Sequence, residues 1–381
     1  MKKVLLPVIC FINTVCFSQN TRISGKSFRP FKYKIVISNA FNDKYYNGNS
    51  ITDSAAVQNG TFDFTVPSQT ADIPYAYRFN DKISAGSFFQ SDVFFIDSKT
   101  KYITVGKEGD PQNFEIISNS QSITGEMAKM QAYFSEFNKE KQSFYDKSRA
   151  EYEKFPDKQK IPQKFWDSYQ AEEKKFSVKE DLLLSGYVKE NRNSFTGLWK
   201  LIEKFERNGY EPAYETIFND FSPEIKRKKT AETLRMAIKN AADFRVGNRF
   251  PGSKIKDIKN PGSVFSIPPA KYTLVDFWFS SCKPCLEQMP LYADLYSQYH
   301  PKGFQIIGIA TDQDKYKSNL LKTIGKFNIP WTNYWDTNGR QSSEWTITSF
   351  PTNYLLDENG KIVFKNITEK ELSELLEKKL K

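Results

Sequence analysis

Residues 274–285 read LVDFWFSSCKPC, an apolar strand pattern that runs directly into a Cys-x-x-Cys motif. The next segment, 286–299, has apolar residues at helical spacing, so the motif lies between a buried strand and a helix. Free N–H groups and the macrodipole at a helix N-terminus favour a thiolate. We therefore predict that Cys282 is the attacking, solvent-facing sulfur. Cys285, one turn further in, is predicted to be shielded and to resolve the mixed disulfide at high effective concentration.

Two neighbours fit this arrangement. Lys283 adds positive charge beside the sulfurs, and Pro284 stands in the first helical turn, where its missing N–H costs nothing.

The composition excludes several classes of protein and several other uses of the two cysteines. The chain has 381 residues, four cysteines and one histidine, His300, so it can form two or three domains but not a small disulfide scaffold, a Cys/His protease or a Ser-His-Asp hydrolase of the usual form. A structural disulfide across a two-residue gap would constrain little chain entropy. A zinc site would need a second pair of Cys or His ligands, which the sequence lacks, and haem attachment requires histidine where Leu286 stands. We predict neither a metal nor a cofactor.

The first eighteen residues have the pattern of a secretory signal peptide. Lys2 and Lys3 precede an uncharged apolar run to Phe17, which is shorter than a membrane span of about 20 residues. We expect cleavage after Ser18 and a location in the periplasm or cell envelope. An uncleaved anchor and a buried N-terminal strand are the alternatives.

That cleavage would remove two of the four cysteines, Cys10 and Cys16, and leave Cys282 and Cys285 as the only thiols. Lipid attachment at Cys16 is a rival, to which Val15 before it is a poor match. The net charge is +10, with one dense basic run at 226–229. We interpret that run as a solvated helix face and predict no nucleic-acid binding and no membrane span in the mature chain.

The chain changes character twice after the leader. Residues 19–120 contain short alternating segments, at 32–38, 61–66, 93–96 and 102–105, which predict a small antiparallel β-sandwich. Residues 121–245 are rich in Lys, Glu, Phe and Tyr at helical spacings and predict a helical region with breaks near Pro156, Pro162 and Pro212.

From residue 246 to 381 strand and helix patterns alternate. Strands are expected at 272–279 and 304–310, a hairpin at 352–364, and helices at 286–299, 314–327 and 368–380. This order predicts an α/β domain with helices on both sheet faces.

The motif segment 274–285, with Pro290 after it, resembles the active site of a thioredoxin fold and is most similar to TlpA/ResA-like thiol:disulfide oxidoreductases. The segment 350–360, FPTNYLLDENG, resembles the cis-proline strand and hairpin of that family. Sixty-six positions separate Cys285 from Pro351, which resembles the TlpA-like subclass with its extra strand and helix. The resemblance covers about residues 246–381. Residues before it resemble, more loosely, a β-rich domain of unknown function and a helical spacer.

The resemblance implies roles for further residues. Pro351 would be cis and, with Phe350, present the backbone to a client peptide; a trans proline at a strand start is the alternative. Asp276 would be buried behind Cys285 and shuttle its proton, unless it is only a hydrogen-bonded strand residue. Trp278 would pack beside the motif.

Lys283 and Pro284 complete the client-binding set with Trp278, Phe350 and Pro351. Glu287 matches an acidic position common after the motif, and it either tunes the site or is simply solvated.

These patterns predict an exported thiol:disulfide oxidoreductase that reduces or exchanges disulfides in envelope proteins, supplied by a thiol electron donor. One alternative is a peroxiredoxin-type peroxidase, although Val275 and Phe279 stand where its Pro-x-x-x-Thr-x-x-Cys motif needs proline and threonine. Another is a client- or ligand-binding protein that uses the redox module as a tether or sensor.

Overall fold

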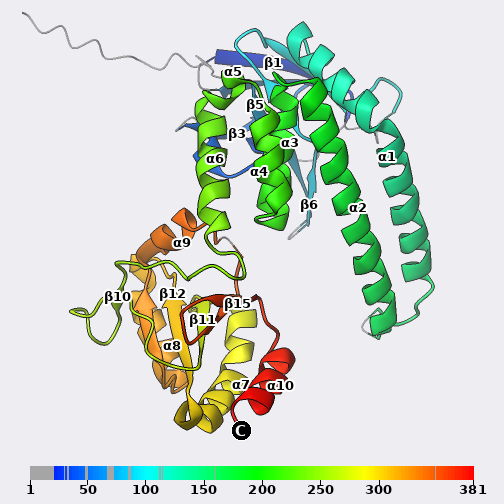
Figure 1. Ribbon diagram of the computed structural model, residues 1–381. Helices are drawn as coiled ribbons and strands as arrows, with labels where there is room; N and C mark the ends of the chain where they lie inside the picture. Colours follow the sequence, from blue (N-terminus) through cyan, green and yellow to red (C-terminus); the bar gives the residue numbers. More distant parts are fainter. Residues whose placement is uncertain are drawn as a thin grey trace, which may run out of the picture. The chain divides into compact units, whose positions relative to one another are not determined.

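The computed structural model (Figure 1) describes residues 21–381 except 30, 32–33, 48–49, 67–72, 85–86, 111–112, 114, 159 and 348, and describes only the backbone of strand residues 81–84 and 87–89. The predicted signal peptide and Ser18 lie outside the described residues. The chain divides into two compact units. The first comprises the described residues up to Glu203 and Asn219–Glu232, and the second Lys204–Phe218 and Thr233–Lys381.

Two sheets form the β-rich part of the first unit. One has the order β4-β1-β8-β9, and the other has the order β3-β2-β5-β6 with β7 also paired to β5. The strands are β1 (Thr21–Ser27), β2 (Lys34–Asn39), β3 (Thr52–Ala56), β4 (Thr61–Val66), β5 (Tyr75–Ser84), β6 (Ser87–Gln90), β7 (Phe94–Ile96), β8 (Tyr102–Val105) and β9 (Ile116–Ser118). Alternation along β4 buries Phe62, Phe64 and Val66, and the Phe64 ring stacks on Phe79 of the other sheet at 5.4 Å.

The sandwich-like arrangement is confirmed, but the expectation of a wholly antiparallel one is wrong. Strand β1 pairs with β8 in parallel. Periodicity tells which face of a strand is buried, whereas the direction of its neighbour depends on connections that periodicity does not encode.

Helices follow from residue 121, as expected. They are α1 (Gln121–Glu153), α2 (Gln163–Glu190), α3 (Phe195–Asn208), α4 (Pro212–Asp220), α5 (Pro223–Lys226) and α6 (Lys229–Ala242). Helix α1 ends before Pro156, α2 begins after Pro162 and α4 begins at Pro212, because proline is tolerated in a first turn but not in a helix interior. No helix among the described residues is both long and apolar enough to span a bilayer.

A six-stranded sheet, in the order β10-β13-β12-β11-β14-β15, forms the centre of the second unit. Its strands are β10 (Lys256–Asp257), β11 (Tyr272–Trp278), β12 (Phe304–Ala310), β13 (Thr332–Trp335), β14 (Thr352–Asp357) and β15 (Ile362–Lys365). Strands β11, β12 and β13 are mutually parallel, and β14 is antiparallel to β11. The expected strands and hairpin are confirmed, whereas the sequence pattern predicted no residue range for β10 or β13.

The helices of this unit are α7 (Lys283–Tyr299), α8 (Lys317–Lys326), α9 (Arg340–Glu344) and α10 (Glu369–Lys379). Helices α7, α8 and α10 share one apolar core with β11 and β12. Right-handed crossovers from β11 to β12 and from β12 to β13 put α7 and α8 on the same face. The opposite face is covered by Trp345, which follows α9, and by aromatic residues of 244–265. Helices therefore cover the two faces unequally, which the sequence pattern did not predict.

Candidate active site

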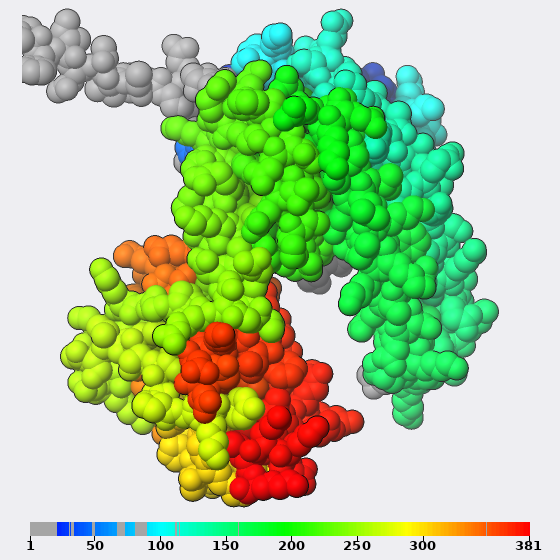
Figure 2. Space-filling model, viewed as in Figure 1, coloured from blue at the N-terminus to red at the C-terminus, as the bar shows by residue number. Residues whose placement is uncertain are grey.

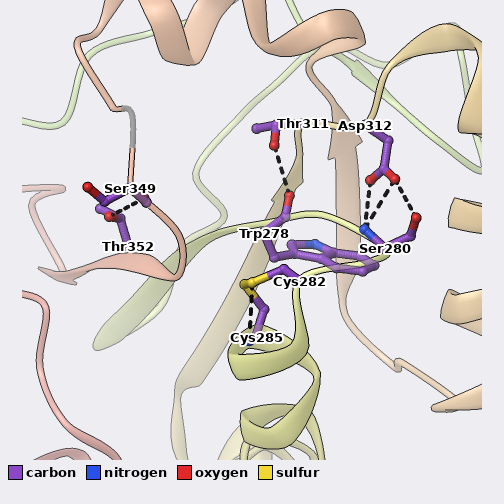
Figure 3. The surroundings of a disulfide bond; sticks show 8 residues. All are labelled: Trp278, Ser280, Cys282, Cys285, Thr311, Asp312, Ser349 and Thr352. Carbon is purple, nitrogen blue, oxygen red and sulfur yellow. Dashed lines mark hydrogen bonds between the residues drawn. A yellow bond between two sulfur atoms is a disulfide. The ribbon is translucent and has the colours of Figure 1, made fainter. Parts of the chain in front are cut away.

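The two cysteines form a disulfide at the N-terminus of α7 (Figure 3). Cys282 is the N-cap of the helix, and its Sγ accepts a hydrogen bond from the Cys285 backbone N–H at 3.3 Å. Pro284 lies in the first helical turn, as expected. The first sulfur thus receives an amide that has no partner inside the helix, which is the interaction that would stabilise a negative charge there.

The expectation of a solvent-facing Cys282 is wrong for the disulfide form. Cys282 is 3% exposed and Cys285 1%. Both belong to the core cluster against which Phe279, Leu286 and Phe350 pack as partly buried side chains. A helix N-terminus predicted from sequence does not reveal which distant side chains cover it.

Asp312 holds the loop that precedes Cys282, and sequence reasoning did not single it out. Its carboxylate accepts hydrogen bonds from the Ser280 backbone N–H at 3.0 and 3.1 Å and from the Ser280 hydroxyl (Figure 3). Beside it, the Thr311 N–H and hydroxyl both donate to the Trp278 carbonyl. Adjacent parallel strands end at the same sheet edge. A polar residue just after the buried strand at 304–310 could therefore have been predicted to lie near the motif that follows the strand at 272–278.

A polar row crosses the sheet on the face that α7 covers. Asp276 of β11 pairs in register with Asn353 of β14 and with Gly308 of β12, which in turn pairs with Asn333 of β13. Leu274 and Trp278, two positions either side of Asp276, belong to the core cluster that contains both cysteines. Strand alternation therefore points Asp276 toward that same core.

Asp276 is 1% exposed, and its Oδ1 has no hydrogen-bond partner among the described residues. Burial raises the pKa of Asp276 from 3.8 to about 7. Burial, and after it the charge of Asp276, raises the pKa of Tyr292, which lies two turns after Cys285 on α7. Tyr292 also accepts a hydrogen bond from Asn353 Nδ2 at 3.3 Å. The open alternative of a simply hydrogen-bonded Asp276 does not match this environment.

Trp278 is fully buried, and its Nε1 donates to Asn333 Oδ1 at 3.0 Å. Gly308 makes room for this bond, since a Cβ there would lie 2.0 Å from Asn333 Oδ1 and 3.0 Å from Trp278 Nε1. Trp278 packs beside the motif as expected. Its predicted contact with a client is wrong for this form, because no indole surface is exposed.

The remaining predicted client contacts lie at or near the surface. The Phe350–Pro351 peptide is cis, as expected, and Pro351 is half-buried. The Phe350 ring meets Phe279 edge to face at 5.5 Å. Lys283 and Pro284 are exposed, with the Lys283 ammonium 3.8 Å from Glu287.

Known proteins resemble the second unit. The family model described as Redoxin matches residues 245–378. Thiol-disulfide oxidoreductase ResA of Bacillus cereus is 26% identical over 132 residues, which cover 35% of this chain and 75% of that protein. ResA of Bacillus thuringiensis is 27% identical over 138 residues, covering 36% and 78%.

Among solved structures, the thioredoxin domain of a thiol-disulfide oxidoreductase from Bacteroides vulgatus has 29% identity and a TM-score of 0.33, covering 36% of this chain and 99% of that one. The C-terminal domain of a thiol-disulfide oxidoreductase from Bacteroides thetaiotaomicron has 24% identity and a TM-score of 0.32, covering 35% and 95%.

The family model and the ResA relatives agree with the Cys282–Cys285 disulfide at a strand–helix junction and support thiol:disulfide oxidoreductase activity. Over residues 245–378 the chain therefore matches the Redoxin family and is similar to the ResA proteins, which supports a TlpA/ResA-like protein of the thioredoxin superfamily with thiol:disulfide oxidoreductase activity.

Proposed function

We propose that the protein is exported and reduces or exchanges disulfides in envelope proteins, with Cys282 as nucleophile and Cys285 as resolving thiol. The observation that carries this proposal is the Cys282–Cys285 disulfide at the start of α7. Export is supported by the leader pattern of residues 1–18.

Thiol–disulfide exchange with a client proceeds in two steps. The Cys282 thiolate attacks one sulfur of a client disulfide, forming a mixed disulfide and releasing the other client sulfur as a thiolate. The Cys285 thiolate then attacks Cys282 Sγ, which forms the intramolecular disulfide and releases the second client thiol. Two electrons pass from the pair to the client, and a thiol donor resets the pair by the same exchange in reverse.

Asp276 supplies the proton transfer in this proposal. Resolution requires Cys285 to lose a proton, and a carboxyl whose pKa is raised to about 7 can accept it near neutral pH and return it afterwards. Asp276 lies between Leu274 and Trp278, which share a core with Cys285. This position and the unpartnered Oδ1 of Asp276 support the assignment.

A client would approach over the exposed Lys283 and Pro284 and over Phe350 and Pro351. Lys283 places a positive charge beside Cys282 that favours thiolate over thiol. Phe350 offers a partly buried apolar ring next to the core that holds the disulfide. Trp278 supports this surface from below through its bond to Asn333.

Reduction of insulin disulfides by the full chain, driven by a thiol donor, tests the proposal. Wild-type protein should accelerate reduction, whereas Cys282→Ser and Cys285→Ser should each abolish turnover. Equal activity of wild-type and Cys282→Ser protein would contradict it. Peroxide consumption measured on the same samples separates exchange from the peroxidase alternative, which requires rapid oxidation of Cys282 by hydrogen peroxide.

A further inference from the structure

The distal part of the α1–α2 hairpin, residues 138–179, has an apolar surface that the first unit does not bury. Phe137 and Glu180 are each 3% exposed, but no described residue between them is buried. This segment contains eight aromatic residues: Phe144, Tyr145, Tyr152, Phe155, Phe165, Trp166, Tyr169 and Phe176. Figure 1 shows the hairpin extending past the sheets of its own unit, and Figure 2 shows its distal part as a projecting arm. Seven of these rings are half-buried and Trp166 is 37% exposed, and a contiguous, partly exposed aromatic surface of this kind marks an interaction site.

The rings are ordered into a groove between the two helices. Tyr145, Arg149 and Tyr152 share one face of α1 by their helical spacing. Tyr152 meets Trp166 of α2 at 6.2 Å, and Phe144 stacks on Tyr169 of α2 at 5.3 Å. The cavity so formed measures about 370 Å³ and is lined by Gln142, Tyr145, Ser148, Arg149, Tyr152, Phe165, Trp166 and Tyr169. Its size and aromatic lining suit a bound apolar group.

The positive charge of the groove indicates which kind of partner it can bind. Arg149 is the one charged residue that lines it, and among the described residues no carboxylate pairs with Arg149. Neighbouring carboxylates are already engaged, Glu151 by Lys154 and Glu153 by Lys158. Residues 138–179 carry eleven Lys or Arg against eight Asp or Glu. The groove is therefore complementary to an anionic partner.

We propose that this groove binds an unstructured segment of a client polypeptide in which an aromatic or aliphatic side chain is flanked by carboxylates. The apolar side chain enters the cavity lined by Tyr152 and Trp166, and a carboxylate pairs with Arg149. A second copy fits less well, because two hairpins with an excess of positive charge repel each other. The inference rests on the proposed function, since a disulfide oxidoreductase acts on polypeptide clients.

Binding of a dye-labelled, cysteine-free peptide of alternating Phe/Leu and Asp/Glu to the full chain, followed by fluorescence anisotropy, tests the inference. Arg149→Glu should weaken binding at least about tenfold by reversing a charge in the interface. Trp166→Ala should also weaken it at least about tenfold, as loss of an aromatic anchor does. Lys147→Glu, the same charge change on α1 outside the groove, should change affinity less than about twofold.

A peptide with Lys replacing Asp and Glu should bind at least about tenfold more weakly than the acidic one. The inference is overturned if wild-type protein does not bind the acidic peptide, if both peptides bind equally, or if Lys147→Glu matches Arg149→Glu. It is also overturned if light scattering shows self-association that Trp166→Ala abolishes.

Insulin reduction measured in parallel keeps the two proposals apart, because the peptide has no thiol. Failed binding with intact exchange refutes the groove alone, and failed exchange with intact binding refutes the redox proposal alone. Unchanged far-ultraviolet circular dichroism of each variant shows that it is folded.

Discussion

Replacing Asp276 with asparagine should remove a pH-dependent destabilisation of the oxidised protein. Burial raises the folded-state pKa of this carboxyl from 3.8 to about 7. Between about pH 4 and 7, the folded chain therefore keeps a proton on Asp276 that the unfolded chain has lost. Stability is highest below the unfolded-state pKa and falls as pH rises through the folded-state pKa. At 1.36 kcal/mol per pKa unit, the full effect is about 4 kcal/mol above pH 8.

Asp276→Asn keeps the shape and stays neutral. We expect the variant and the wild-type protein to have similar free energies of unfolding near pH 4, and the variant to be more stable by up to about 4 kcal/mol at pH 8 to 9. Denaturant titrations of both oxidised proteins from pH 4 to 9 measure this difference. Asp294→Asn, an exposed aspartate on α7, is the matched control and should give a flat difference. A flat difference for Asp276→Asn would refute the burial argument.

Three further changes probe the same region. Gly308→Ala should destabilise by about 1–3 kcal/mol, because its Cβ would lie 2.0 Å from Asn333 Oδ1, whereas Gly325→Ala, with nothing within 4 Å, should not destabilise in the same denaturant titration. Asp312→Ala should cost about 1–3 kcal/mol by leaving Ser280 without its acceptor and should also slow insulin reduction; unchanged stability would contradict the loop-holding role. Lys283→Glu should change the free energy of unfolding by less than about 0.5 kcal/mol but slow alkylation of reduced Cys282 by iodoacetamide. Lys322→Glu, at an exposed position on α8, should leave the alkylation rate unchanged.

The parts of the site that are local in sequence were predictable. Strand β11 is a mostly apolar run and α7 has a regular apolar spacing, so the position of Cys282 and Cys285 at their junction follows from periodicity alone. The role of Asp276 came from the family resemblance, and its burial in the strand, where a charge is costly, agrees with that expectation.

The parts that depend on tertiary contacts were not predictable. Asn333 lies on β13, a mixed strand of sequence TNYW without apolar alternation. Its side chain reaches Trp278 of β11 across the intervening strand β12, and this strand order is not encoded in the local sequence. Asp312 is thirty-two positions from Ser280. The burial of Cys282 likewise depends on side chains from distant segments, such as Phe350.

Trapping of a mixed disulfide tests the central claim most directly. Reduced Cys285→Ser protein is incubated with a peptide containing a disulfide, and the adduct is digested and mapped by mass spectrometry without reductant. The account predicts a stable adduct joined to Cys282, because the thiol that would release it is missing. The reciprocal Cys282→Ser protein should give little adduct. Absence of an adduct at Cys282, or equal trapping at Cys285, would contradict the assignment of nucleophile and resolving thiol.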